Sequence, residues 1–406
     1  IVYWHLDILY RSYLFIKLLT LINCLYLYYY FTNNISYYLF DKVYLAINQN
    51  GCLVIKLTQW ITTRLNILYE VEKPLWLEKL NLFFEQCPIH NISYSNSVYK
   101  ELTGNNLWDD YEINDYIISS GSIGQVYKYW HKETKQYRAL KIRHPNISRE
   151  IMIPKTFIIN LIKILKNIKY LNKYIVPIDL DGFFLNLDLQ LDFNIEAQNM
   201  LKMTEIFKNE NFIVIPKLYN FSSNILIMSY EDGTYFDNVK EISDFQKFKI
   251  CMVYMFFYHQ CAILENFNHG DLHQGNWKVR LIDNNNRKDY QIIVYDFGIC
   301  YSQNHPDLFK SYIHAWEKYD INMICDMLYL AYHDYDRLFV KKLRDECYDE
   351  LSKMTLKPFT MKKYLSLIYN VTTKNEMIIP FAVFNLLISL TLCENMLSKN
   401  GMINVG

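Results

Sequence analysis

The sequence predicts an α+β protein in which a short β-rich region separates two helical regions. Apolar residues recur at helical spacing over 13–31, 53–68 and 75–86, and again beyond residue 239. Between these regions, residues 115–130 and 136–144 are rich in β-branched and aromatic residues, and the polar turn His131–Lys135 separates them. Five of the 11 glycines lie in three short segments of the β-rich and second helical regions, which therefore become the candidate functional segments.

On this pattern the chain has three parts. Residues 1–105 form an N-terminal helical extension, whose last helix is expected to end at Cys87-Pro88. Residues 106–235 form a small β-rich lobe with a helical insert, and residues 236–406 form a helical lobe. Further elements are expected as follows: helices at 154–174 and 193–209, a break at 180–188, strands at 212–219 and 224–233, and a hairpin within 268–300 with the tip DNNNR.

Charge and cysteine content exclude several classes of protein. Lys plus Arg and Asp plus Glu number 42 each, so no global basic field favours nucleic acid as a partner. The nine cysteines include no C-x-x-C pair, which argues against a disulfide framework or a zinc site. We expect an intracellular protein, cytoplasmic or peripheral to a membrane such as that of a mitochondrion or plastid, and not a secreted one.

Two apolar stretches are candidates for membrane contact. Residues 13–31 are long enough to span a bilayer but include Lys17 and Asn23. Residues 378–393 carry no charge but are short and contain Pro380. Core or docking helices are favoured for both stretches, and insertion of residues 13–31 in a membrane is left open. The start at Ile1 says nothing about a targeting peptide.

Glycine is scarce, with 11 residues in 406, so the positions where it is retained are informative. Gly121 and Gly124 fall between two predicted strands in a segment we call the glycine loop (residues 119–124). A backbone free of bulky side chains can approach phosphates there and offer them N–H groups. Lys141 follows in the apolar run ALKI, where an ammonium group is costly unless it meets an anion such as a phosphate.

A second glycine-bearing segment supplies carboxylates. Asp271 and Asn276, in the catalytic loop (residues 269–276), have the D-x-x-x-x-N spacing of a catalytic base and a magnesium ligand. Asp296 begins the D-F-G segment (residues 296–298) directly after a β-rich run, so it can present a carboxylate to the same metal. Each motif alone is weak, but their order and local context are typical of one fold. The predicted fold class is α+β: a bilobal protein kinase-like fold with a small β-rich N-lobe, a helical C-lobe and an N-terminal helical extension.

Four stretches make the similarity more specific. They are IKLTQWITTRLNIL (55–68), IISSGSIGQVYKY (117–129), LQLDFNIEAQN (189–199) and HGDLHQGN with VYDFG (269–276 and 294–298). The sequence resembles the UbiB-type atypical kinase family, which comprises kinase-like proteins associated with coenzyme Q and other isoprenoid-lipid pathways. The resemblance extends over about residues 10–400.

The resemblance implies Mg²⁺ and ATP as cofactors and assigns roles to residues. Asp271 is the implied catalytic base, and Lys141 contacts phosphates while paired with Glu196. Asn276 and Asp296 are the implied metal ligands. The implied nucleotide contacts come from the glycine loop, a hinge and a covering helix: Ser120, Gly121, Ser122, Gly124, Gln125, Met228, Tyr230, Glu231, Lys56 and Gln59, with Lys141. For His269 and His273, hydrogen-bonded scaffolding is favoured over metal binding.

The sequence departs from the family pattern at several positions. Thr58 replaces the glycine of K-x-G-Q, and Gln190 replaces the first carboxylate of E-x-D, which leaves Asp192 alone. Serines and Gly121 replace alanines in the glycine loop. From these changes we expect weaker inhibition of phosphoryl transfer than in relatives.

Three functions are considered. The first is a Mg–ATP-binding atypical kinase or ATPase that supports isoprenoid-lipid or quinone metabolism at a membrane surface. The second is an active protein or small-molecule phosphotransferase, because the HGDLHxGN loop also occurs in aminoglycoside and choline-type kinases. The third is a non-catalytic lipid-binding scaffold with a vestigial site. The expected partners are ATP and a lipid or membrane surface, and a homodimer is left open.

Overall fold

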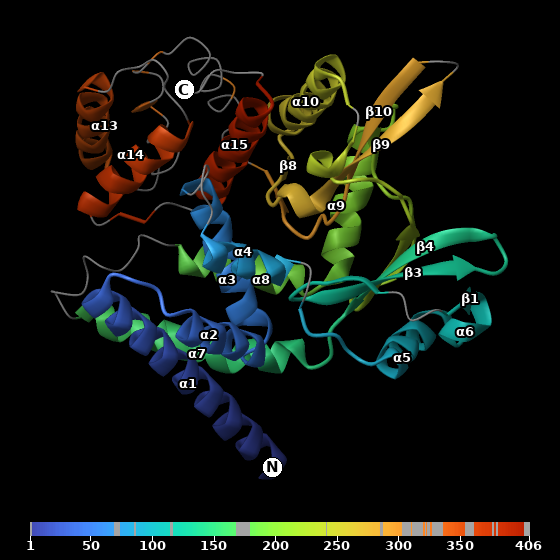
Figure 1. Cartoon of the computed structure of the whole chain (residues 1–406), viewed down its shortest axis with the longest axis horizontal. Helices are drawn as coiled ribbons and strands as arrows, with labels where there is room; N and C mark the ends of the chain where they lie inside the picture. The colour runs from blue at the N-terminus through green and yellow to red at the C-terminus, as the bar shows by residue number, and fades with distance from the viewer. Residues whose placement is uncertain are drawn as a thin grey trace. The chain divides into compact units, whose positions relative to one another are not determined.

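Figure 1 shows a computed structural model of the chain. It describes residues 2–68, 74–84, 87–113, 117–167, 179–240, 242–284, 287–302, 310, 320, 322, 325–326, 336–353, 361–375, 377–378 and 381–401. The chain forms two compact units, one of residues 1–172 and 219–230 and the other of residues 173–218 and 231–406. The three-part division drawn from the sequence remains a prediction.

The first unit begins with a helical cluster. Its helices are α1 (Val2–Thr32), α2 (Tyr37–Gln49), α3 (Cys52–Leu68), α4 (Leu75–Asn81) with the 3-10 turn Leu82–Phe84, and α7 (Ile147–Asn167). Phe15, Phe40, Ile55 and Phe83 pack in one buried cluster of these helices. The helix expected at 53–68 is confirmed, and α1 begins earlier than expected. The helix expected over 75–86 ends at Asn81 and continues as the 3-10 turn, with residues 85–86 outside the described ranges.

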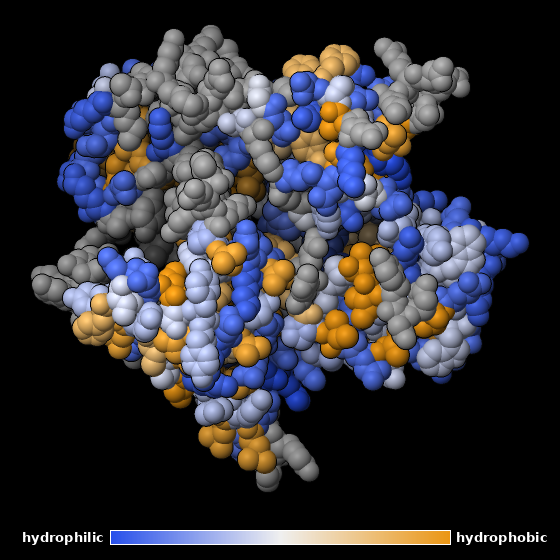
Figure 2. All heavy atoms as spheres, in the orientation of Figure 1, coloured by the Kyte–Doolittle hydropathy of each residue, from blue (hydrophilic) through white to orange (hydrophobic). Residues whose placement is uncertain are grey.

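Helix α1 leaves much of its apolar surface exposed. His5–Thr32 has a mean hydropathy of 1.5, and only 17% of its most apolar window is buried. Tyr26, Tyr30 and Phe31 are among its exposed aromatic residues, and hydrophobic atoms reach the surface along this helix in Figure 2. Within the described ranges it is the one helix long and apolar enough to cross a membrane. Length and composition are weak grounds for a span, because signal sequences and core helices share them.

A six-stranded sheet completes the first unit. Its strands are β1 (Tyr111–Glu112), β2 (Ile117–Ser120), β3 (Gly124–His131), β4 (Gln136–Arg143), β6 (Leu218–Ser222) and β7 (Ile225–Ser229), in the order β1-β3-β4-β7-β6 with β2 beside β3. The predicted turn after His131 is confirmed, and Lys135 adopts a positive φ of 51° within it. Helices α5 (Ile92–Thr103) and α6 (Leu107–Asp110) contribute Tyr99 and Leu107 to a core with Leu140 and Ile142.

The second unit is mostly helical. Its elements are α8 (Leu180–Gln190), α9 (Phe193–Ile206), β5 (Ile213–Val214), the 3-10 turn Phe236–Asn238, α10 (Asp244–His259) with the π-helical turn Gln260–Leu264, β8 (Asn268–His269), the 3-10 turn Gln274–Asn276, β9 (Trp277–Asn284), β10 (Arg287–Val294), β11 (Cys300–Tyr301), α13 (Arg337–Lys353), α14 (Met361–Lys374) and α15 (Phe381–Lys399). The hairpin expected within 268–300 is confirmed as β9–β10. Residues 285–286 of its tip lie outside the described ranges.

Three predicted elements need correction. The break expected over 180–188 is wrong, because Asp179 caps α8 by accepting a hydrogen bond from Gly182 N–H and the helix buries Phe183 and Leu187. The strand expected over 212–219 is two strands in different sheets, separated at Pro216, which cannot donate to a ladder. The helix expected from residue 154 begins at Ile147, and residues 168–174 lie outside the described ranges.

Candidate active site

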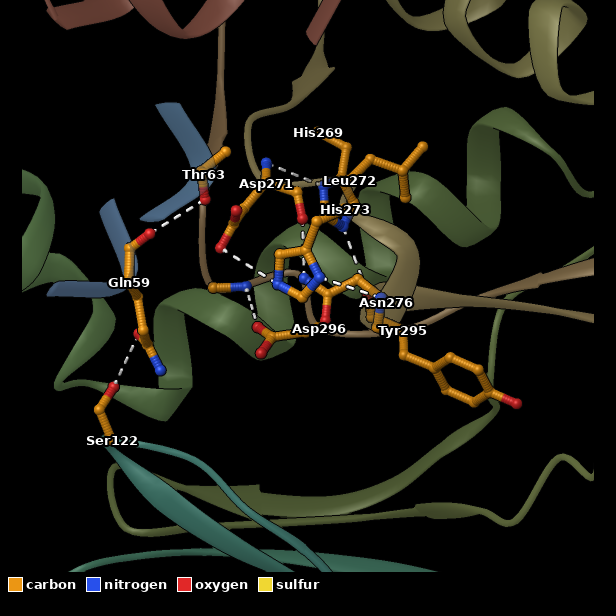
Figure 3. A network of polar contacts seen from close by, with 12 residues as sticks. Gln59, Thr63, Ser122, His269, Asp271, Leu272, His273, Asn276, Tyr295 and Asp296 are labelled. Atoms are coloured by element: carbon orange, nitrogen blue, oxygen red, sulfur yellow. Dashed lines mark hydrogen bonds and ion pairs between the residues drawn. The ribbon is translucent and has the colours of Figure 1, made fainter. Parts of the chain in front are cut away.

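Two strand pairings in the second unit join the catalytic loop to the D-F-G segment. His269 of β8 lies opposite Cys300 of β11, and Trp277 of β9 lies opposite Val294 of β10. The strands at the two ends of the catalytic loop, β8 and β9, therefore pair with the strands at the two ends of the D-F-G segment, β11 and β10. This register explains how Asp271, Asn276 and Asp296 come from distant parts of the sequence into one backbone framework (Figure 3).

The two histidines of the catalytic loop are hydrogen-bonded within this framework. His269 Nε2 donates to the Tyr295 carbonyl at 3.2 Å, and its Nδ1 accepts from Asp271 N–H at 3.3 Å. Burial lowers the pKa of His269, which favours this neutral form. His273 Nδ1 accepts from Gly275 N–H at 3.0 Å, so its Nε2, 4.0 Å from Asp271 Oδ2, carries the proton. Both imidazoles make the scaffold contacts that the sequence favoured.

Asn276 and Asp296 present oxygen atoms from neighbouring positions of the hairpin. Tyr295 N–H donates to the Asn276 carbonyl at 2.8 Å, which places Asp296 directly beyond that pairing. Asn276 Nδ2 donates to the Asp271 carbonyl at 2.7 Å, so the amide orientation is fixed and Oδ1 is its remaining polar atom. Asp296 is exposed and has a φ of 55°, a left-handed conformation that costs on the order of 1–3 kcal/mol.

The donor set of this pair fits Mg²⁺. A carboxylate and an amide oxygen are hard donors, and Mg²⁺ usually takes one or two such protein ligands with phosphate oxygens and water. Within the described ranges, no group of three His, Cys, Asp or Glu side chains could hold a metal ion. Asp296 Oδ1 accepts a bond from Gly298 N–H at 3.2 Å, which orients the carboxylate.

Helix α9 contacts the D-F-G segment through Asn199 and places Glu196, one turn earlier, close to Gly298. Asn199 Nδ2 donates to the Phe297 carbonyl at 2.9 Å. Glu196 is buried, and its Oε2 lies 3.7 Å from the position that a Cβ would take at Gly298. Sequence reasoning gave Asn199 no role in the site. Its spacing of three from Glu196, which places both residues on one helix face, was the signal available.

We predict that Asn199→Leu weakens the site without unfolding the chain. The change removes the donor to the Phe297 carbonyl, and a net hydrogen bond contributes about 0.5–1.5 kcal/mol. The affinity for Mg–ATP, measured by titration calorimetry, should fall about three- to tenfold. Asn186→Leu is the matched control, because it removes only the hydrogen bond from Asn186 Nδ2 to the Gly182 carbonyl within α8. An unchanged affinity in Asn199→Leu would contradict the assigned role.

In the first unit, α3 contacts the glycine loop. Ser122 Oγ donates to Gln59 Oε1 at 3.3 Å (Figure 3). Gln59 Nε2 donates to the Phe83 carbonyl at 2.7 Å. Ser120 Oγ donates to the Pro88 carbonyl at 3.0 Å. Lys56 lies one helical turn before Gln59 and is half-buried. The predicted covering helix thus touches the predicted nucleotide loop at Gln59.

Gln125 and Lys141 lie on different faces of the sheet. Gln125 is fully buried, and its amide accepts from His90 N–H at 2.9 Å and donates to Tyr127 Oη at 2.6 Å. These contacts support the sheet, and a contact of Gln125 with nucleotide remains a prediction. Lys141 alternates with the core residue Leu140 on β4, so it lies on the opposite face, half-buried, and not fully buried as its apolar run suggested. Its pairing with Glu196 remains a prediction.

The predicted hinge coincides with the boundary between the units, which falls after Tyr230. Met228 lies within β7, next to its last residue. Tyr230 N–H donates to the Tyr137 carbonyl at 3.3 Å. In the second unit, the Glu231 carboxylate forms an ion pair of 2.7 Å with Arg280, and its carbonyl accepts from Tyr295 Oη at 2.8 Å. Tyr230 and Glu231, on the two sides of the predicted hinge, therefore each form hydrogen bonds within their own unit.

The departures from the family pattern are accommodated locally. Thr58 Oγ1 donates to the Val54 carbonyl of its own helix at 2.8 Å. Gln190 is buried and donates to the Asn186 carbonyl at 3.0 Å. Asp192 caps α9 by accepting from Asn194 N–H at 3.0 Å. The remaining carboxylate of the E-x-D motif thus has a capping role within its own unit.

Comparison with known proteins identifies the family. The profile of the ABC1 atypical kinase-like domain matches residues 83–326. The chain belongs to this family. The resemblance to UbiB-type proteins and the kinase-like α+β fold class are thereby confirmed. The family match covers the glycine loop, Lys141, Glu196, the catalytic loop and the D-F-G segment, and it begins after Lys56 and Gln59.

The ABC1-family chain is similar to several curated proteins. It is 29% identical over 251 residues to the probable serine/threonine-protein kinase abkC of Dictyostelium discoideum, covering 60% of this chain and 35% of that protein. A mitochondrial ABC1 family protein of Saccharomyces cerevisiae is 28% identical over 268 residues, covering 59% and 39%. The probable protein kinase UbiB of Shewanella piezotolerans is 23% identical over 246 residues, covering 58% and 43%. The aligned region spans less than half the length of each relative.

A solved structure also aligns with the chain. The complex of Rv3197 with erythromycin from Mycobacterium tuberculosis has a TM-score of 0.47 and 16% identity, covering 76% of this chain and 80% of that one.

Proposed function

We propose that this ABC1-family chain is a Mg–ATP-dependent atypical kinase or ATPase that supports isoprenoid-lipid or quinone metabolism at a membrane surface. The observation that carries the proposal is the shared backbone framework of Asp271, Asn276 and Asp296. In this proposal they would supply a carboxylate base and two oxygen donors, the groups that phosphoryl transfer uses.

The roles of the residues follow from their chemistry. Asp271 would accept a proton from the attacking water or hydroxyl group, and His273 Nε2–H faces its carboxylate. Asn276 Oδ1 and Asp296 would hold Mg²⁺, which when bound neutralises phosphate charge. Lys141 would bind phosphate oxygens and would be oriented by Glu196. Met228 to Glu231 would read the base through backbone groups.

The second function, a phosphotransferase acting on a protein or small molecule, uses the same groups with a different acceptor. The contact between Gln59 and Ser122 favours the UbiB-type function, because it couples an N-terminal helix to the glycine loop. Small-molecule kinases with the HGDLHxGN loop lack such a helix. The exposed apolar surface of α1 supports a membrane or lipid surface as a partner.

The test separates hydrolysis from transfer. The chain is incubated with Mg²⁺ and γ-labelled ATP alone, with candidate acceptors, and with liposomes. We expect release of labelled phosphate that increases with liposomes. Asp271→Asn should lower the turnover rate by about 10²–10⁴-fold, because that is the usual contribution of a general base. Label on an acceptor instead of free phosphate would favour the second function. Binding without turnover in the parent would favour the scaffold.

A further inference from the structure

A closed set of hydrogen bonds is buried beside the glycine loop in the first unit. Its side chains are His90, Ser95, Gln125, Tyr127 and His144, which come from the segment before α5, from α5, from β3 and from the residue after β4. Ser95, Gln125 and Tyr127 are at most 2% exposed. The proposed chemistry of the site uses neither histidine.

The two ends of this set fix the direction of its hydrogen bonds. At one end, Gln125 Oε1 accepts from His90 N–H, so the amide cannot be reversed and Nε2 must donate to Tyr127 Oη. At the other end, the Gly121 carbonyl lies 3.0 Å from His144 Nε2 and can only accept.

With both imidazoles neutral, the bonds between these ends have one consistent arrangement. Tyr127 O–H donates to Ser95 Oγ at 2.7 Å, and Ser95 O–H donates to His90 Nε2 at 2.9 Å. His90 Nδ1–H donates to His144 Nδ1 at 2.7 Å, and His144 Nε2–H donates to the Gly121 carbonyl. We call this chain of bonds the histidine relay. In this arrangement the proton of neutral His90 lies on Nδ1 and that of neutral His144 lies on Nε2.

The surroundings favour the neutral forms. Burial, with a contribution from His144, lowers the pKa of His90 to about 4, and burial lowers the pKa of His144 as well. The ring of Tyr94 in α5 packs edge-on against the His90 ring, with their centroids 5.2 Å apart. Arg143 and Glu101 are the charged groups that influence the pKa of Tyr94. At neutral pH each imidazole can therefore donate one bond and accept another.

The relay ends on the backbone of the glycine loop. His144 contacts the loop twice, because its backbone N–H donates to the Ile123 carbonyl at 2.9 Å and its side chain holds the Gly121 carbonyl. A trans peptide is planar, so its C=O and N–H point in opposite directions. Fixing the Gly121 carbonyl toward His144 therefore directs Ser122 N–H away from His144. Backbone N–H groups of such loops are the donors that bind phosphate oxygens.

We propose that His144, with His90 behind it, is a positioning residue that sets the glycine loop for the phosphates of ATP. This inference rests on the proposed function, because it deepens the role of the same loop. A positioning role predicts that the relay affects the affinity for phosphate groups and leaves the affinity for the nucleoside unchanged.

The test compares His144→Leu with His144→Gln in the full chain. Leucine can neither donate nor accept, whereas the glutamine amide keeps one donor and one acceptor. For His144→Leu we expect the Kd of Mg–ATP to rise about five- to tenfold, as for the loss of one or two net hydrogen bonds, with the Kd of adenosine unchanged. His144→Gln should restore most of the Mg–ATP affinity. Urea midpoints for each variant check that the chain is folded.

The outcomes separate the two proposals. Failure of the parent chain to bind Mg–ATP would overturn the proposed function and this inference with it. Parent binding together with an unchanged Kd in a folded His144→Leu would overturn the inference alone. Equal losses for Mg–ATP and adenosine would also overturn it, because they would indicate general loosening of the fold.

A second measurement needs no variant. In ¹⁵N-histidine-labelled parent protein at pH 7, the nitrogen chemical shifts should report Nδ1–H for His90 and Nε2–H for His144. The opposite tautomer at either residue, or a charged imidazole, would overturn the relay even if every variant failed to fold.

Discussion

Replacing Asp296 with asparagine is expected to abolish the stabilisation that Mg–ATP gives the parent chain. A ligand present at about 100 times its Kd raises the free energy of unfolding by about 2.7 kcal/mol. Asparagine keeps the size of the side chain, retains an oxygen that can accept from Gly298 N–H, and tolerates the left-handed φ of 55° at this position. The substitution therefore removes the charge that would hold Mg²⁺ and little else.

The measurement is thermal melting with and without Mg–ATP. Asp192→Asn is the matched control, because asparagine caps a helix as well as aspartate does and residue 192 caps α9. The control should keep the full shift in melting temperature, and chelation of Mg²⁺ by EDTA should remove it from the parent. A full shift in Asp296→Asn would show that this carboxylate does not hold the metal.

Replacing Gly270 with alanine is expected to destabilise the second unit by about 1–3 kcal/mol, the usual cost of an overfilled site. A Cβ at this position would lie 2.6 Å from Ile299 Cγ2 and 3.0 Å from Tyr301 Cε1. Gly270 N–H also donates to the Ile299 carbonyl, so the two segments cannot separate without loss of that bond. This glycine is therefore required for close packing of β8 against the residues after the D-F-G segment.

Urea unfolding of Gly270→Ala is best measured beside Gly121→Ala. A Cβ at Gly121 would meet only the Gly124 carbonyl oxygen, at 3.7 Å, which is an ordinary contact. The Gly121 variant should therefore unfold at the parent midpoint, while its autophosphorylation should fall if glycine aids approach to the phosphates. Equal midpoints for both variants would contradict the packing role of Gly270.

The local motifs of the sequence were sufficient to predict that the catalytic loop and the D-F-G segment lie in one backbone framework, and the roles of their residues stay predictions. The spacing of Asp271 and Asn276, and the position of Asp296 after a strand, predicted their shared framework because β-pairing register brings such residues together. The helix α8 was missed because Asp181-Gly182 reads as a turn, whereas burial of Phe183 and Leu187 outweighs that local preference.

Long-range side-chain contacts could not be predicted in the same way. Gln125 belongs to the recognisable S-I-G-Q-V motif, yet its side chain points to the core face and bonds to Tyr127 and His90. Asn199 contacts Phe297 across 98 positions of the sequence, and no periodicity encodes that pair. Such contacts depend on tertiary packing that propensity and spacing do not specify.

The hydrogen bonds that anchor the glycine loop limit where the chain can be truncated. The groups that anchor the glycine loop and the start of β3 all lie before residue 106. They are Gln59, Pro88, His90 and the Cys87 N–H. The Cys87 N–H donates to the Ser120 carbonyl at 2.7 Å. A fragment that starts at that residue would retain every strand of the large sheet but would lose these anchors of the turn between β2 and β3. A fragment of the first unit that keeps all of these anchors therefore has to begin upstream of α3.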